Sequence, residues 1–237
     1  MKNNKKITVL SIIIPVFNEH KTVSQLLSKV QSVKLKGISK QLIVVDDRST
    51  DGTREILKKL SKKKPGFTLI LKEKNEGKGS AIRAAIPHIT GSYTVIQDAD
   101  LEYDPAEYPL LLKPILSGHA DVVYGSRFLG AHRSFLFLNY VANKILNFVT
   151  NILYNSTMTD MESCYKMFRS EILTSLKLRS KGFEIEPEIT AKILKKKCKV
   201  YEVPISFYGR GYEEGKKIKA IDGVKALWCL LKYRITD

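Results

Sequence analysis

The sequence predicts an α/β fold with one mostly parallel sheet and helices on both of its faces. Short runs rich in Val and Ile alternate with segments of helical periodicity along the first half of the chain, which is typical of parallel strands joined by crossover helices. A turn signal follows each run and delimits the strand. The predicted strands cover residues 9–14, 42–45, 67–71, 93–96 and 121–123.

The helices between these strands have recognisable starts. Asn18 precedes a segment that ends near residue 30, and Ser49 or Asp51 can cap a helix that runs to residue 59. Glycines open a third helix near residue 78. Right-handed crossovers then place the carboxyl ends of the parallel strands at one edge of the sheet.

The composition indicates a single folded unit. The chain has 237 residues, 43% of them hydrophobic, and no linker rich in Pro, Gly or Ser divides it. One α/β core with an amphipathic helical extension at the C-terminus accounts for this length. Cys164, Cys198 and Cys229 form no CxxC pair, so we expect reduced thiols in a cytosolic compartment.

The formal net charge of +16 suggests an anionic partner. Nucleic acid, an anionic membrane surface and a phosphorylated substrate all suit a basic protein. The lysines occur in short runs on predicted helix faces, without the interleaved aromatic residues of a nucleic-acid site. We therefore expect no nucleic-acid partner, and the charge alone leaves the membrane and the phosphorylated substrate open.

Two C-terminal segments have amphipathic patterns. Residues 135–154 carry Lys144 as their only charge, and asparagines recur at every fourth position from 139 to 151, which places an amide stripe along one helical face. The stripe argues against a membrane span and favours an interfacial helix, apolar toward lipid or core. In residues 220–234, core packing is the more common explanation of an apolar stripe formed by Ile221, Val224, Leu227, Trp228 and Leu231.

Polar clusters at residues 15–19, 46–53 and 97–102 follow three of the strands and should meet at one edge of the sheet. The last cluster contains Asp98 and Asp100. Two carboxylates after a buried strand repel each other unless a cation lies between them. Oxygen ligands without His or Cys nearby indicate Mg²⁺ or Mn²⁺, with Glu102 either as a third ligand or as a base for water bound to the metal.

Further candidates for ligand binding lie beside these acids. One of Asp46 and Asp47 could accept hydrogen bonds from a uracil or guanine ring, and Lys78 in a glycine-rich helix start suits an anionic group. Cations for a diphosphate leaving group and a phosphate nucleophile are available at Arg127, Arg210, Lys216 and Lys217.

Several motifs are similar to those of a known family. The chain resembles the family 2 glycosyltransferases with the GT-A fold, and among them the dolichyl-phosphate mannose synthases and related polyprenyl-phosphate glycosyltransferases. The matching segments span nearly the whole chain in the expected order. They are IIIPVFNE (12–19), VVDDRSTDGT (44–53), NEGKGSA (75–81), QDADLEYDP (97–105), ADVVYGSRF (120–128), DMESCYKMFR (160–169) and EVPISF (202–207).

The resemblance implies roles for individual residues. Pro15, Phe17, Glu19 and Asp47 would line the nucleotide pocket, with Asp46 beside them. Asp98 and Asp100 would bind the metal, with Glu102 adding to it. Lys78 and Ala99 are further candidates for binding the nucleotide sugar. Arg127 would face the acceptor phosphate, and Arg210 and Lys216 would clamp the donor diphosphate from a mobile loop. The sequence departs from the family pattern at Arg48, where a small residue is usual, and at Asn139, where relatives often carry a basic residue or His.

The implied activity is the metal-dependent, inverting transfer of one hexose from a nucleotide sugar of the GDP-mannose or UDP-glucose type to a polyprenyl or dolichyl phosphate. Residues 1–130 would form the donor half of one domain, and residues 131–237 the acceptor half with its membrane-surface helices. The C-terminal transmembrane helices of many relatives are absent from this sequence. We therefore expect a peripheral enzyme on the cytoplasmic face of an anionic membrane, held by its own helices, by an anchoring partner or as a homo-oligomer.

Other functions follow from different readings of the same residues. A sugar-hydroxyl acceptor stays open, because a carboxylate that could remove its proton is available at Asp160, Glu162, Glu184 or Glu186. A sugar nucleotidyltransferase would need a glycine-rich, Arg-containing loop after the first strand, which IPVFNE does not supply. A non-catalytic basic binding module would have no use for Asp98 and Asp100.

Overall fold

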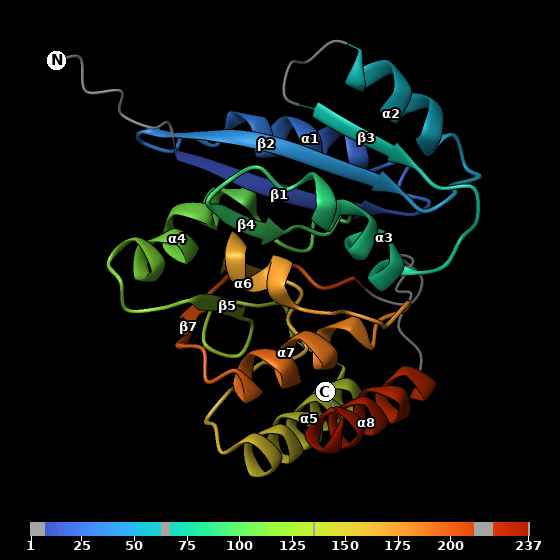
Figure 1. Cartoon of the computed structure of the whole chain (residues 1–237). Helices are drawn as coiled ribbons and strands as arrows, with labels where there is room; N and C mark the ends of the chain where they lie inside the picture. Colours follow the sequence, from blue (N-terminus) through green and yellow to red (C-terminus); the bar gives the residue numbers. More distant parts are fainter. Residues whose placement is uncertain (1–7, 63–66, 135, 211–219, 237) are drawn as a thin grey trace, which may run out of the picture.

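A seven-stranded sheet forms the centre of the protein (Figure 1). The computed structural model describes residues 8–62, 67–134, 136–210 and 220–236. The strand order is β3-β2-β1-β4-β6-β5-β7, and neighbouring strands are parallel except that β6 is antiparallel to β4 and β5. The strands are β1 (Thr8–Val16), β2 (Ile38–Asp46), β3 (Phe67–Leu71), β4 (Tyr93–Ile96), β5 (Val122–Ser126), β6 (Lys166–Arg169) and β7 (Val200–Pro204). The predicted mostly parallel α/β architecture is confirmed.

Helices cover both faces of this sheet, as predicted. The helices are α1 (Val23–Ser32), α2 (Thr53–Ser61), α3 (Lys78–Ala85), α4 (Tyr108–Leu116), α5 (Phe137–Tyr154), α6 (Ser170–Ser175), α7 (Ile185–Lys195) and α8 (Ala220–Ile235), with short 3-10 turns η1 (Ile86–His88) and η2 (Pro105–Glu107). One core cluster joins the sheet to α1, α2 and α4, and a second joins it to α3, α6 and α7. Successive side chains of a strand point to opposite faces, and so Ile12 belongs to the first cluster and Ile13 to the second.

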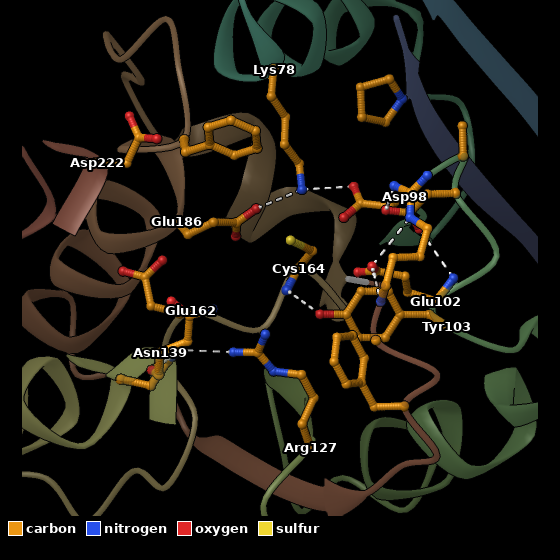
Figure 2. A pocket seen from close by; sticks show the side chains of 18 of the residues that line it. Lys78, Asp98, Glu102, Tyr103, Arg127, Asn139, Glu162, Cys164, Glu186 and Asp222 are labelled. Atoms are coloured by element: carbon orange, nitrogen blue, oxygen red, sulfur yellow. Dashed lines mark hydrogen bonds and ion pairs between the residues drawn. The ribbon is translucent and has the colours of Figure 1, made fainter. Parts of the chain in front are cut away.

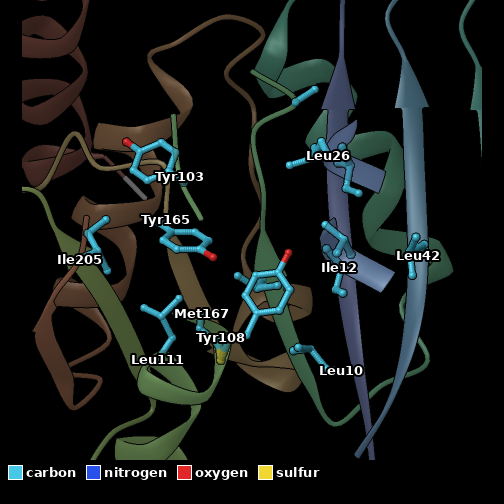
Figure 3. Packing of buried hydrophobic residues seen from close by; sticks show 14 of the residues in the cluster. Leu10, Ile12, Leu26, Leu42, Tyr103, Tyr108, Leu111, Tyr165, Met167 and Ile205 are labelled. Atoms are coloured by element: carbon cyan, nitrogen blue, oxygen red, sulfur yellow. The ribbon is translucent and has the colours of Figure 1, made fainter. Parts of the chain in front are cut away.

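The first core layer contains a row of aromatic side chains between sheet and helices (Figure 3). Tyr103, Tyr108 and Tyr165 are all buried, and their rings lie 5.2–6.0 Å apart, centroid to centroid, for the two pairs in contact. Tyr108 Oη donates a hydrogen bond to Gln97 Oε1 at 2.9 Å. Because Gln97 follows β4 directly, this bond fixes the start of the loop that carries Asp98.

Two strands and one helix cap differ from the prediction. Neither β6 nor β7 was predicted, because KMFR is short and bounded by charges and VYEVP contains Glu202 and Pro204. Gly52, with a φ of +92°, precedes α2 in place of the predicted Ser49 or Asp51 cap. Arg48 has a φ of +63°, a backbone conformation that glycine adopts without strain, in keeping with the small residue usual there.

Two helices form an additional layer behind α7, on the second face of the sheet. Helices α5 and α8 lie side by side against α7, at the bottom of the view in Figure 1. Tyr154 of α5 donates a hydrogen bond from Oη to the Leu230 carbonyl of α8 at 2.7 Å. The C-terminal helical extension is therefore part of the compact structure, and its far side faces away from the sheet.

Candidate active site

The loops after β1, β2 and β4 meet at one edge of the sheet, as predicted. Asn18 N donates a hydrogen bond to Ser49 Oγ at 2.9 Å, and Glu19 N donates one to Thr53 Oγ1 at 3.0 Å, so the first two loops are joined directly. A cavity of about 760 Å³ lies along this edge. The predicted site residues that line it are Pro15, Phe17, Glu19, Asp47, Lys78, Asp98, Ala99, Asp100, Glu102, Arg127 and Arg210.

Asp98 pairs with a lysine from α3. Lys78 Nζ lies 2.7 Å from Asp98 Oδ1 and 3.1 Å from Glu186 Oε1 of α7 (Figure 2). Burial raises the pKa of Asp98, but the charge and hydrogen bond of Lys78, with the Cys164 hydrogen bond and the Lys166 charge, together outweigh it, and the pKa lies below its usual value. Lys78 was predicted to bind an anionic ligand; the anions beside it in this structure are the chain's own carboxylates.

Asp100 and Glu102 share a different cation. Arg210 Nη2 lies 2.9 Å from Asp100 Oδ2, and Arg210 Nε lies 3.3 Å from Glu102 Oε1. The same guanidinium is 3.7 Å from Glu19 Oε2. Burial and the charges of Asp98 and Glu102 raise the pKa of Asp100 to about 7. The negative charges of Asp98 and Glu102 make a cation next to Asp100 favourable.

The three predicted metal ligands do not converge on one point. In the part of the chain that the structure describes, no group of three or more His, Cys, Asp or Glu side chains is arranged to hold a metal ion. Asp98 turns to Lys78, whereas Asp100 and Glu102 turn to Arg210, because buried carboxylates pair with the nearest cation. The oxygens of Asp100 and Glu102 already surround one cation, and such a donor set suits Mg²⁺ or Mn²⁺.

The adjacent acids after β2 have separate roles. Asp47 lines the cavity and accepts hydrogen bonds from Gly77 N and Lys72 Nζ, both at 2.6 Å. Asp46 is fully buried, pairs with Arg54 at 2.6 Å and does not line the cavity. Asp46, which was predicted with the nucleotide pocket, thus lies beside the cavity and not in its lining, because successive side chains of a strand point to opposite faces.

The glycine-rich start of α3 is packed tightly against the loop before α7. Gly77 has a φ of +97°, and a Cβ at this position would lie 2.6 Å from the Lys181 carbonyl oxygen. Only glycine fits such a position. The close approach sets Lys78, the next residue, inside the cavity rather than on the surface.

Arg127 lies in the cavity wall, bound by an acid from the loop before β6. Its Nε and Nη2 atoms lie 2.8 and 2.7 Å from the two oxygens of Asp160, a bidentate pair. The guanidinium also lies over the Phe207 ring, 5.3 Å from its centroid. Arg127 is thus held rigidly, as a residue that positions an anion requires. The other predicted cations, Lys216 and Lys217, lie outside the described residues.

A buried ionic group, which the sequence did not reveal, supports the cavity from α7 and β6. Lys166 is fully buried, and its Nζ contacts Glu186 Oε2 and the Ser163 carbonyl. The same ammonium lies 4.8 Å from the centroid of the Tyr124 ring. Glu186 therefore bridges Lys78 and Lys166, and the signal in the sequence was a pair of acids in the first turn of α7.

The profile of glycosyl transferase family 2 matches residues 11–176. The chain belongs to this family. It is similar to the dolichol-phosphate mannosyltransferase of Pyrococcus furiosus, with 32% identity over 230 residues, which are 94% of this chain and 64% of that protein. It is also similar to the glycosyltransferase AglJ of Haloferax volcanii, with 29% identity, covering 84% of this chain and 63% of that protein. The chain thus spans less than two thirds of the length of either relative.

Solved structures agree with the fold. Glucosyl-3-phosphoglycerate synthase from Mycobacterium tuberculosis, in complex with Mn²⁺, uridine diphosphate and phosphoglyceric acid, superposes with a TM-score of 0.75 at 18% identity. The match covers 97% of this chain and 80% of that chain. This family 2 glycosyltransferase therefore has the GT-A fold.

Among the four carboxylates that could act as a base in this glycosyltransferase, three are already bound. Asp160 holds Arg127, Glu186 holds Lys78 and Lys166, and Glu184 accepts a hydrogen bond from Gly182 N at 3.0 Å. Glu162 lines the cavity, and its Oε1 is buried with no hydrogen-bond partner among the described residues. Burial raises the pKa of Glu162 to about 7.

The raised pKa makes Glu162 a pH-dependent cost to folding. The folded protein keeps the Glu162 carboxyl protonated up to about pH 7. The loss of stability therefore grows as the pH rises above the ordinary carboxyl pKa, and it is complete above pH 7. Replacement by Gln (Glu162→Gln) is expected to raise the melting temperature by about 2–4 °C at pH 8, with a smaller gain at pH 5. Differential scanning calorimetry checks this, with the exposed Glu73→Gln as control; an equal gain at both pH values would contradict it.

Helix α5 has its polar stripe inside and its apolar stripe outside. Asn147 accepts a hydrogen bond from Met161 N at 2.7 Å and donates one to the Thr159 carbonyl at 2.8 Å, and Asn151 binds Met158 in the same way at 2.8 and 2.9 Å. Phe148 on the other side is 66% exposed. The predicted amide stripe exists, and it holds the loop before β6 against the helix.

The expectation that the apolar stripe of α8 packs in the core is wrong. Trp228 is 68% exposed and Val224 is 63% exposed. The helix instead buries Ala226, Cys229, Leu230 and Tyr233 against α5 and α7. This four-residue face suffices for the packing, so the predicted apolar stripe points away from the protein. No described helix meets the length and hydropathy needed to span a membrane.

Proposed function

We propose that this glycosyltransferase moves one hexose from a nucleotide sugar onto a polyprenyl phosphate at the surface of an anionic membrane. The observation that carries the proposal is the extent of the cavity. It runs from Asp98 and Asp100 at the sheet edge to apolar and small residues of α5 and α8, among them Leu138, Leu146 and Ala226. An acceptor with a phosphate and an apolar chain matches both ends of such a cavity.

The outer side of the same two helices supports a membrane partner. Among the described residues, 18 large hydrophobic side chains are exposed, and twelve of them lie on α5 and α8. Exposed apolar patches of this kind mark contact surfaces. Lys225, Lys232 and Arg234 of α8 are exposed beside the patch, α5 contains no acid, and Asp222, the one acid of α8, lines the cavity. Apolar side chains flanked by cations complement anionic lipid headgroups.

The relatives supply further support. The Pyrococcus furiosus protein is a dolichol-phosphate mannosyltransferase, and a complex of the mycobacterial synthase contains UDP-glucose with Mn²⁺. We therefore propose a GDP-mannose or UDP-glucose type of donor, with Mg²⁺ or Mn²⁺ bound by Asp100 and Glu102. A divalent cation there would neutralise the charge that develops on the departing diphosphate.

The transfer itself needs no base with a phosphate acceptor. A phosphate oxygen, already anionic at neutral pH, forms a bond to the anomeric carbon as the bond from that carbon to the diphosphate oxygen breaks. The nucleoside diphosphate leaves with the electron pair, and the configuration inverts. Arg127, held by Asp160, orients the acceptor phosphate, and Arg210 exchanges its carboxylate partners for the donor diphosphate.

A second acceptor class is favoured by one observation. Glu162 has the raised pKa and the free oxygen of a general base, which a sugar-hydroxyl acceptor would require. Turnover with a panel of GDP- and UDP-sugars, Mn²⁺ and a short-chain polyprenyl phosphate distinguishes the two. An acid-labile lipid-linked sugar supports the lipid acceptor, and transfer only to saccharides supports the hydroxyl acceptor. If the protein neither binds nor turns over any nucleotide sugar, both proposals are refuted.

If α5 and α8 bind the membrane, negative charges introduced on their exposed apolar side should strongly weaken vesicle binding. The double variant Phe148→Glu with Trp228→Glu is expected to reduce partitioning onto phosphatidylglycerol vesicles by about 100-fold or more, because each side chain loses at least about 1.5 kcal/mol of apolar burial. Vesicle co-sedimentation measures this. The matched control changes Leu110 and Leu116, exposed on α4, to Glu; an equal loss in the control would contradict the assignment of the face.

A further inference from the structure

Two buried polar atoms in the cavity wall have no partner in the described part of the chain. They are Oε1 of Glu162 and Nδ2 of Asn139, and both residues line the cavity. In Figure 2 both lie on the side of the cavity away from Asp98 and Glu102. A buried polar atom without a hydrogen bond costs about 1–3 kcal/mol, so a ligand that pairs with both atoms would recover that cost.

The charged groups near Glu162 explain why it stays unpaired. Lys166, Glu186, Arg127 and Asp160 are the charges that act on it. Lys166 is bound to Glu186, and Arg127 is bound to Asp160. Both cations are therefore neutralised by other acids, and neither is available to Glu162. One oxygen of the carboxyl group thus has no hydrogen-bond partner among the described residues, in a side chain that lines the cavity.

The two atoms have complementary chemistry. The Glu162 oxygen accepts a hydrogen bond, and the Asn139 amide donates one. A sugar hydroxyl does both, whereas a fully ionised phosphate only accepts and would be repelled by an ionised Glu162. Lys78 and Arg210, the cations that suit the donor diphosphate, lie with Asp98 and Asp100 on the other side of the cavity. Arg127, which suits the acceptor phosphate, acts on Glu162 but is bound by Asp160. The group that pairs with both the Glu162 oxygen and the Asn139 amide is therefore an uncharged hydroxyl-bearing group.

We propose that Glu162 and Asn139 bind hydroxyl groups of the transferred hexose, Glu162 as acceptor and Asn139 as donor, and thereby select the donor sugar. This inference rests on the proposed transfer from a nucleotide sugar, and it gives Glu162 a binding role in place of a base. A site built to bind a hydroxyl discriminates strongly against an analogue that lacks it. Selection would then follow from the orientation of one or two hydroxyl groups.

The test combines enzyme variants with deoxy donors. The full chain, Glu162→Gln and Asn139→Ala are assayed for kcat/KM with the preferred nucleotide sugar and with its 2-, 3-, 4- and 6-deoxy analogues. We expect about 10- to 100-fold loss for one deoxy donor in the unmodified enzyme, a similar loss for Glu162→Gln with the full donor, and little further loss when the two changes are combined. Binding of the free nucleoside diphosphate should stay within about twofold, since it lacks the sugar.

The matched control is Glu107→Gln. Glu107 Oε2 is also buried without a partner among the described residues, and burial raises the pKa of Glu107, but it does not line the cavity. The Glu107→Gln variant should discriminate between the full and the deoxy donors as strongly as the unmodified enzyme does. The inference would be overturned if, for every deoxy donor, the loss of kcat/KM from the donor and the loss from the Glu162 or Asn139 variant simply multiplied. A uniform fall in kcat for all donors would also overturn it. Failure of the unmodified enzyme to use any nucleotide sugar would refute the proposed function instead.

Discussion

Replacement of Asp100 by Asn is expected to reduce sugar transfer by about 10²- to 10³-fold, the usual effect of removing one electrostatic contact to a developing charge. Asn has the shape of Asp but no negative charge, and it would weaken the pairing of this position with Arg210 or a divalent cation. The folded protein should tolerate the change. Burial and neighbouring acids already raise the pKa of Asp100 to about 7, so a neutral side chain suits this position in the free protein.

Initial rates at saturating Mn²⁺ and melting temperatures test this prediction together. The matched control is Asp104→Asn, the same change four residues along the chain. Asp104 accepts a hydrogen bond from Ala106 N at 3.1 Å, which Asn can also accept, and it does not line the cavity. The prediction fails if Asp100→Asn retains full activity, or if its loss of activity is explained by unfolding at the assay temperature.

Replacement of Glu186 by Gln is expected to have the largest effect on stability, a loss of about 3–5 kcal/mol in the free energy of unfolding. Glu186 contacts Lys166, which is fully buried, and Lys78, whose side chain is 10% exposed. With Gln at position 186, the contacts that remain for Lys166 among the described residues are the Ser163 carbonyl and the Tyr124 ring. Breaking a buried ion pair on one side is costly because the remaining charge stays buried.

Urea denaturation measures the effect as a shift of the midpoint at constant slope. The double variant Glu186→Gln with Lys166→Met removes the stranded charge and should recover most of the lost stability. Glu184→Gln is the neighbouring control, since its acceptor oxygen for Gly182 N is retained. Equal stability of the single and double variants would show that the Lys166 charge is not the cause.

Much of the fold and part of the site follow from the sequence alone. Strand and helix patterns repeat along the first half of the chain, and parallel strands must end at one edge. The meeting of Phe17, Asp47, Asp98 and Asp100 around one cavity was therefore predictable without coordinates. The order of the motifs also sufficed to place the chain in its family, because each motif follows a strand that the fold positions.

The tertiary structure alone decided how these side chains pair and which way the helices face. Asp46 and Asp47 are adjacent, yet one pairs with Arg54 below the surface and the other lines the cavity. Lys78 and Arg210 reach the acids from distant parts of the chain, and Glu162 stays unpaired only because its neighbours are bound elsewhere.

Helices α5 and α8 show the physical reason most directly. Periodicity determines that a helix has an apolar side, but it does not determine what that side contacts. In α8 Leu230 packs inward and Trp228 points outward, and in α5 Asn147 points inward and Phe148 outward. The sequence by itself determined the first five strands, the helices that follow them and the acidic edge, which depend on local pattern. Partners and orientations depend on contacts between distant residues, and only the folded chain decides them.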